Sequence, residues 1–346
     1  MQTGVISIGL DHVVWFINHC VAVLKQVLLT PDGDVSIAAL LCNLCIALIV
    51  VSCRARPTRK TASIPALLRG IFPKRLFRSR SVRADLIFFL FNVILASLLF
   101  GWALLSTQTV SALVYDALLA VAGQRAPMMT AAWATVVLTV GLYLAFEFGY
   151  WLNHWLSHRN PVLWEFHKVH HAAEVLTPLT NFRVHPVYSI IFFNVIALSM
   201  GFAGGVLRWV LGQEVSQFTL FNTNAILIGT SYLIEHLQHS HFWIPLTGWL
   251  GRLIVSPAHH QIHHSIDPRH FNRNFGSTLA IFDWLFGTLY VPTKKRERLT
   301  FGVDDNNPVH HTVYGGLVAP VLGAGRVALE SVRQALAGKP APDPER

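Results

Sequence analysis

Histidine is the residue type in this sequence that is best placed to do chemistry. Thirteen of the 18 histidines lie between positions 154 and 264. Three groups are regularly spaced: His154 and His158 form H-x-x-x-H, and the runs 167–171 and 260–264 each form H-x-x-H-H. Residues three or four apart share a face of a helix, so the imidazoles of each group are expected to converge. Convergent imidazoles are typical of a metal site.

The number of histidines indicates two metal ions. The three regular groups hold eight histidines, and we expect the run 235–241 to add one or two ligands. One zinc ion takes about four ligands, and imidazole also suits copper, iron and nickel. The candidate ligands are His154, His158, His167, His170, His171, His236, His239, His260, His263 and His264. His185 and Glu235 are candidates for supporting these ligands or lining a substrate site, and Glu235 is the carboxylate alternative for the ligand from its run.

The composition predicts an integral membrane protein. Of 346 residues, 53% are hydrophobic and 13% are charged, whereas soluble domains carry about 25% charged residues. This excludes an ordinary soluble domain, a disordered chain and a nucleic-acid binder. Apolar segments at 36–53, 85–107, 131–152, 187–211 and 215–235 approach the ~20 residues that cross a bilayer. Segment 5–30 either spans or lies at the interface, and segment 110–124 is too short to span.

The basic residues predict the orientation of these segments. Ten Lys and Arg lie between Arg54 and Arg83, and such clusters face the cytoplasm. Every histidine group then emerges at the cytoplasmic face. We therefore predict an all-α fold of about four to six membrane helices with a cytoplasmic helical cap that holds a two-metal site.

The predicted organisation has four parts. Residues 1–84 form N-terminal membrane segments and a basic interfacial segment, 85–139 form membrane helices, 140–291 form the domain that contains the histidine groups, and 292–346 form a partly disordered C-terminal extension. The four cysteines all precede residue 54. They lack the second C-x-x-C pair of a zinc site and do not suit iron–sulfur ligation.

The histidine groups resemble those of the fatty acid hydroxylase/sterol desaturase superfamily of membrane di-iron oxygenases. The resemblance covers about residues 140–291 and extends to Asn181–Pro186, Asn274–Gly276 and Asp283–Thr288. It implies that the eight histidines of the three regular groups bind iron. His239 followed by Ser240 matches the intermediate ligand region of the family.

The resemblance also implies a reaction. We expect O2-dependent hydroxylation, or desaturation, of a C–H bond in a membrane lipid, with two iron ions as cofactor and O2 as co-substrate. Zinc can replace both irons in a purified sample, since imidazole binds it well. The sequence has no G-x-G-x-x-G, so the electrons are expected from a separate ferredoxin or cytochrome with its reductase. The predicted location is a multi-pass position in the membrane, the inner membrane if the source is bacterial.

Three other functions would also require groups of histidines in a membrane protein. A metal transporter would distribute its histidines along a path through the bilayer, whereas these gather at one face. A haem-binding electron carrier would use pairs of histidines, whereas H-x-x-H-H offers three within about one turn. A zinc-dependent membrane hydrolase would be expected to carry H-E-x-x-H, which is absent.

Overall fold

The computed structural model describes residues 2–33, 35–54, 70, 73–303 and 307–337. Most residues of this part of the chain are helical, and its two strands form one short β-hairpin. Much of the predicted basic segment, including Arg56 and Lys60, lies outside the described residues, as does the tail 338–346.

The N-terminal part consists of apolar helices. The elements in order are α1 (Gln2–Leu29), α2 (Ile37–Arg54), α4 (Lys74–Arg78), α5 (Arg80–Leu90), the π-helix η1 (Phe91–Ala96), α6 (Ser97–Phe100) and the 3-10 turn η2 (Gly101–Ala103). Helix α2 coincides with the predicted segment 36–53. The predicted segment 85–107 is not one continuous α-helix, because it changes to a π-helix at Phe91 and to a 3-10 turn at Gly101.

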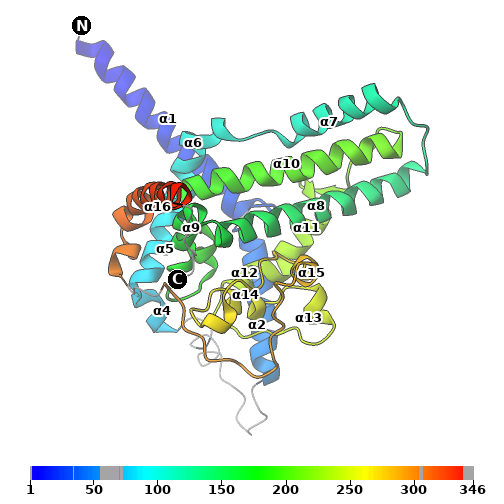
Figure 1. Ribbon diagram of the computed structural model, residues 1–346. Coiled ribbons are helices and arrows are strands. Elements are labelled where there is room, and N and C mark those ends of the chain that lie inside the picture. The colour runs from blue at the N-terminus through cyan, green and yellow to red at the C-terminus, as the bar shows by residue number, and fades with distance from the viewer. Residues whose placement is uncertain (1, 34, 55–69, 71–72, 304–306, 338–346) are drawn as a thin grey trace.

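Three long helices lie side by side in Figure 1, with α10 (Pro186–Leu211) between α7 (Thr107–Ala122) and α8 (Ala131–Arg159). Two glycines on α10 let α7 approach closely. A Cβ on Gly201 would lie 2.5 Å from the Cβ of Val110, and one on Gly205 would lie 2.6 Å from the carbonyl oxygen of Ser111. Small residues four apart are a common means of close packing between membrane helices.

Four described stretches are long and apolar enough to cross a membrane. They are Leu98–Ala122, Ala131–Arg159, Pro186–Leu211 and Tyr314–Leu336. The second and third coincide with the predicted segments 131–152 and 187–211. The first includes residues 110–122, which the sequence suggested were too short to span alone, because the helix is preceded by the apolar residues from Leu98. Val13–Leu29 and Ile37–Val50 are shorter apolar helices.

The prediction of a membrane helix over 215–235 was wrong. Strands β1 (Thr219–Leu220) and β2 (Thr223–Asn224) pair as an antiparallel hairpin, with Phe221 and Asn222 at positive φ in its turn. In this part of the chain, helix begins only at α11 (Ala225–Thr230) and continues as the π-helix η4 (Ser231–Glu235) and α12 (His236–Gln238). The hairpin is anchored to α8, since the backbone N–H of Phe218 donates to the hydroxyl of Thr139 (2.7 Å).

Short elements gather where α8 ends and α10 begins. They are α9 (Pro161–His171), η3 (Pro178–Phe182), α13 (Leu250–Leu253), α14 (Pro257–His263), η5 (Pro268–His270), α15 (Ile281–Leu285) and η6 (Pro308–His311). The chain ends with the π-helix η7 (Tyr314–Val318) and α16 (Ala319–Leu336), which packs on α9. Figure 1 shows α9, α12 and α14 near the same end of the long helices.

The sequence specifies where these short helices begin. The side chain of Asn160 accepts from the backbone N–H groups of Val162 and Leu163, and Pro161 follows it at the first helical position. At the start of α14, Pro257 likewise follows the cap residue Ser256, and the Nδ1 atom of His259 accepts from the backbone N–H of Ser256 (3.1 Å). An oxygen-bearing cap followed by proline is favoured at a helix start. Helices α9 and α14, which carry the two H-x-x-H-H groups, are therefore fixed at their first residues.

Candidate metal centre

Nine buried histidines form two clusters in the structure. We call the first the five-histidine cluster, made of His154, His158, His167, His171 and His263, and the second the four-histidine cluster, made of His170, His239, His260 and His264. Within each cluster the possible ligand atoms, one from each histidine, lie within 4.8 Å of one another. The structure thus brings together nine of the ten predicted ligands, from segments more than a hundred residues apart.

The two H-x-x-H-H groups contribute to both clusters. On α9, His167 and His171 belong to the five-histidine cluster and His170 belongs to the four-histidine cluster. The run 260–264 shows the reverse assignment. His260 and His264 belong to the four-histidine cluster, and His263 belongs to the five-histidine cluster. The rings of His171 and His264, one from each cluster, stack with centroids 4.5 Å apart. The two clusters are therefore adjacent and share their supporting helices.

The nitrogen spacing fits a metal ion in each cluster. In the four-histidine cluster, the Nε2 atom of His239 lies 3.1 Å from that of His170 and 2.8 Å from that of His260. In the other cluster, the Nε2 atom of His171 lies 3.2 Å from that of His167 and 3.1 Å from that of His263. Ligands ~2.1 Å from one ion are about 3.0 Å apart at a right angle and about 3.4 Å apart at a tetrahedral angle. With 3.3 Å between the Nε2 atoms of His264 and His239, the observed spacings range from 2.8 to 3.3 Å, so they suit several imidazoles on one ion.

Backbone carbonyl groups orient two histidines of the five-histidine cluster. The Nδ1–H of His154 donates to the carbonyl of Phe275 (2.9 Å), and that of His263 donates to the carbonyl of Arg273 (2.8 Å). The proton on Nδ1 leaves the lone pair on Nε2, which in His154 is buried and has no hydrogen-bond partner among the described residues. Such hydrogen bonds fix the tautomer and ring orientation of metal-binding histidines.

Two buried carboxylates hold the loop that orients His154. Asp283 accepts from the backbone N–H groups of Phe275 (2.9 Å) and Gly276 (2.8 Å). Glu147, two turns before His154 on α8, accepts from the backbone N–H groups of Thr278 and Leu279. Both carboxylates are fully buried, so their hydrogen bonds are not weakened by competition with water.

Burial keeps the cluster histidines neutral. The loss of hydration lowers the pKa of His170 to about 3 and that of His263 to about 4, compared with an ordinary value of 6.5. Burial and then the neighbouring imidazoles also hold the pKa of His171, His239 and His264 well below that value. Neutral imidazole is the metal-binding form. These residues therefore need to release no proton at neutral pH before binding a metal.

The remaining predicted site residues lie outside both clusters. His236 is buried beside the four-histidine cluster but belongs to neither group, and neither does Glu235. His185 caps α10: its Nδ1 accepts from the backbone N–H of Val187 (3.1 Å) and its Nε2–H donates to the carbonyl of Leu317 (3.0 Å). Both ring nitrogens of His185 are therefore engaged by the protein itself.

Two further residues support the site without a role assigned from the sequence. The side chain of Arg183 is fully buried and forms an ion pair with Asp85 (3.2 Å). Its Nε–H donates to the carbonyl of Val169 (2.9 Å), the residue that precedes His170. His259 accepts on Nδ1 from the backbone N–H of Ser256 (3.1 Å), as part of the cap of α14. The sequence carried a signal only for Arg183, which lies within one of the motifs resembling the family.

Comparison with known proteins gives matches to this same part of the chain. Residues 139–288 match the family model described as fatty acid hydroxylase. The chain is 27% identical to alkylglycerol monooxygenase from Danio rerio over 161 residues, which are 44% of this chain and 30% of that protein. It is 31% identical to an ornithine lipid hydroxylase from Rhizobium tropici over 157 residues, which are 45% of this chain and 43% of that protein.

A sterol desaturase shows the same kind of similarity. The chain is 29% identical to a Delta(7)-sterol 5(6)-desaturase from Aspergillus fumigatus, over 46% of this chain and 51% of that protein. The matches thus span about a third to a half of the length of these relatives, and no solved structure matches the chain. The apolar helices and these relatives together support an integral membrane protein. Residues 139–288 are therefore a fatty acid hydroxylase domain, and over this domain the chain is similar to an alkylglycerol monooxygenase, an ornithine lipid hydroxylase and a sterol desaturase.

Proposed function

We propose that the chain is a membrane-bound di-iron oxygenase that hydroxylates or desaturates a C–H bond of a membrane lipid. The observation that carries this proposal is the pair of adjacent, buried, all-imidazole clusters. The names of the relatives support a lipid as substrate, since they describe an alkylglycerol monooxygenase, an ornithine lipid hydroxylase and a sterol desaturase.

The nine clustered histidines are the proposed ligands, five for one iron and four for the other. The nitrogen spacings of 2.8 to 3.3 Å between neighbouring imidazoles support one shared ion in each cluster. We propose that the lower ligand number of the four-histidine cluster leaves more room there for an exogenous group. Two bound irons would supply the redox chemistry that activates O2 towards an unactivated C–H bond.

The protein's own contribution is to hold the ligands and exclude water. The carbonyl groups of Phe275 and Arg273 fix the rings of His154 and His263. Asp283 and Glu147 fix the loop that carries the first of these carbonyl groups. Burial of all nine imidazoles keeps them neutral and keeps bulk water from the reacting atoms.

The location and the electron supply are also proposals. The basic residues up to Arg83, and the cluster from Lys294 to Arg298, support a cytoplasmic position of the site. Tags inserted after Lys60 and after Lys295 should then both be accessible from the cytoplasm, and opposite locations would contradict the arrangement. We propose that a separate ferredoxin or cytochrome, with its reductase, donates the electrons.

The reaction is tested by comparing lipid extracts from cells that express the wild-type chain or a His170→Ala variant. Mass spectrometry should show a lipid that gains one oxygen atom, or loses two hydrogen atoms, only with the wild-type chain. The gain should carry the label when the cells grow under isotopically labelled O2. Identical extracts from the two strains under iron-replete conditions, with both proteins present in the membrane, would contradict the proposed reaction.

A further inference from the structure

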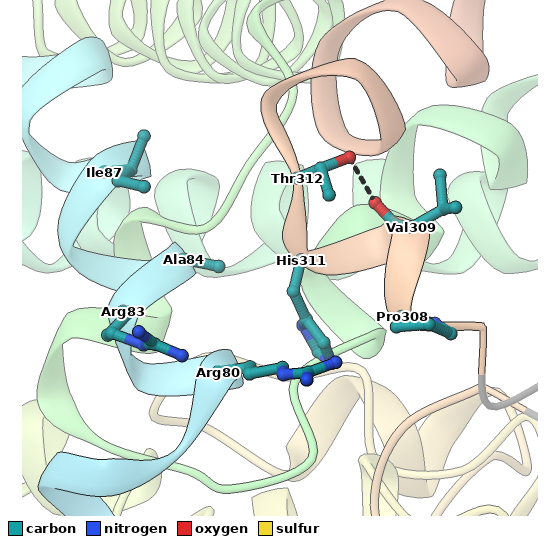
Figure 2. A pocket seen from close by; sticks show the side chains of 8 residues that line it. All are labelled: Arg80, Arg83, Ala84, Ile87, Pro308, Val309, His311 and Thr312. Carbon is teal, nitrogen blue, oxygen red and sulfur yellow. Dashed lines mark hydrogen bonds between the residues drawn. The ribbon is translucent and has the colours of Figure 1, made fainter.

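A surface pocket lies between α5 and η6, outside both histidine clusters (Figure 2). Its volume is about 470 Å³, and Arg80, Arg83 and Ile87 of α5 face Val309 and His311 across it. His311 forms part of the inner wall, because its Nδ1 accepts from the buried Arg183 (3.0 Å). The wall on this side is thereby attached to the interior of the protein.

The open side of the pocket is positively charged. Arg80 and Arg83 are both exposed and lie three residues apart on α5, so their guanidinium groups extend from one helix face (Figure 2). No carboxylate within the described ranges forms an ion pair with either arginine. The nearby carboxylate of Glu174 is engaged by the Nε2 atom of His311 at 3.0 Å. Two arginines on one side of a pocket suit a phosphate group, which guanidinium groups can bind through two parallel hydrogen bonds.

The surface next to the pocket is apolar on both of its walls. On α5, the arginines are followed by Leu86 and Ile87, which are 48% and 49% exposed. On the opposite wall, η6 is followed by Val313 and Tyr314, which are 56% and 55% exposed. In an integral membrane protein, exposed apolar side chains face lipid, and arginine and tyrosine are favoured at the headgroup level. The pocket therefore lies at the boundary between hydrocarbon and headgroups.

We propose that this pocket binds the headgroup of an anionic phospholipid, with the phosphate held by Arg80 and Arg83. The acyl chains then lie on the exposed apolar surface that begins at Ile87 and continues to Leu90. Basic pockets beside membrane helices are known to suit anionic headgroups. Since the pocket shares no residue with the histidine clusters, the proposal does not depend on the reaction that the protein catalyses.

Native mass spectrometry of the full chain in a neutral detergent tests the proposal by counting bound lipids. The probes are phosphatidylglycerol, phosphatidylcholine and inorganic phosphate. We expect phosphatidylglycerol to bind and the zwitterionic lipid to bind at least about tenfold more weakly, since each basic residue contributes to the attraction of anionic lipid. The double variant Arg80→Gln/Arg83→Gln should weaken phosphatidylglycerol binding at least about tenfold.

The matched control is Lys74→Gln/Arg78→Gln. It removes the same charge from the neighbouring helix α4, from two exposed residues that do not line the pocket, and it should leave the affinity nearly unchanged. Equal losses in the two double variants would overturn the proposal in favour of a general surface charge effect. Equal binding of the two lipids would overturn it as well. Displacement of phosphatidylglycerol by inorganic phosphate at comparable concentration would show a free-anion site instead. Unchanged unfolding temperatures of both variants would show that they are folded.

Discussion

Replacement of Asp283 by alanine tests how the protein holds the five-histidine cluster. The carboxylate accepts four hydrogen bonds, from the backbone N–H groups of Phe275 and Gly276 and from the side chains of Thr288 and Trp151, at 2.6 to 3.2 Å. A buried donor left without an acceptor costs about 1–3 kcal/mol. Because the four donors are neighbours and relax together, we take the lower limit for each, or about 4 kcal/mol in all.

The loss should appear both in stability and in metal binding. At roughly 2 °C per kcal/mol for a chain of this size, the unfolding temperature should fall by about 8 °C. The carbonyl of Phe275 would also lose its fixed position relative to His154, and the loss of such support typically weakens metal binding about 10–100-fold. A chelator titration that counts bound metal should therefore remove one ion from the variant well before the other.

An exposed glutamate provides the control for this experiment. Glu214 is exposed, pairs with Arg208 at the surface and belongs to neither histidine cluster. Because surface ion pairs contribute little to stability, Glu214→Ala should leave both the unfolding temperature and the chelator titration nearly unchanged. Asp283→Asn keeps one acceptor oxygen and should fall between the wild type and Asp283→Ala. If Asp283→Ala unfolds at the wild-type temperature, or retains both ions as tightly as the control, Asp283 does not support the five-histidine cluster in this way.

Three further predictions concern individual histidines. His170→Ala leaves three imidazoles in its cluster and His171→Ala leaves four, so metal analysis after dialysis should show a greater loss for His170→Ala; equal losses would argue against the division into two clusters. His239→Ala should lose metal and His236→Ala should retain it, as measured in the same way, and the reverse result would show that the wrong histidine of this run was assigned. Burial lowers the pKa of His236 and His259 to about 4 in the folded chain, so unfolding takes up protons between pH 4 and 6.5. The free energy of unfolding should therefore be highest above this range and fall with decreasing pH, by up to ~1.4 kcal/mol per pH unit for each histidine. Chemical denaturation across the range measures this, and a flat profile would contradict the buried neutral state.

The spacing of the histidines predicted their convergence but not their division between clusters. On a helix of 3.6 residues per turn, His167 and His171 lie about 40° apart around the axis, and His170 lies about 60° to the other side of His167. All three fit one broad face. Which of the two clusters each one joins depends on how α9 and α14 face one another, and this is a property of tertiary packing that the spacing alone does not contain.

Hydropathy correctly located two of the long helices, but it wrongly predicted a membrane helix over residues 215–235. Segments 131–152 and 187–211 are continuous apolar helices because no turn interrupts them. In 215–235, the turn at Phe221 and Asn222 carries neither glycine nor proline, so the sequence had no strong signal for the hairpin. The supporting role of Glu147 was inaccessible, since its backbone partners Thr278 and Leu279 lie more than 130 residues away in the sequence. Asp283 lies in a segment that resembles the family, but the hydrogen bonds that it accepts from Phe275 and Gly276 depend on the path of the loop between them.

Metal analysis shows whether the two histidine clusters hold two iron ions. The full chain should be produced in iron-replete cells, purified without chelator, and measured for iron and zinc per chain. We expect about two irons per chain, one for each cluster. A single tightly held zinc ion, with no second metal bound and no activity after reconstitution with iron, would contradict it.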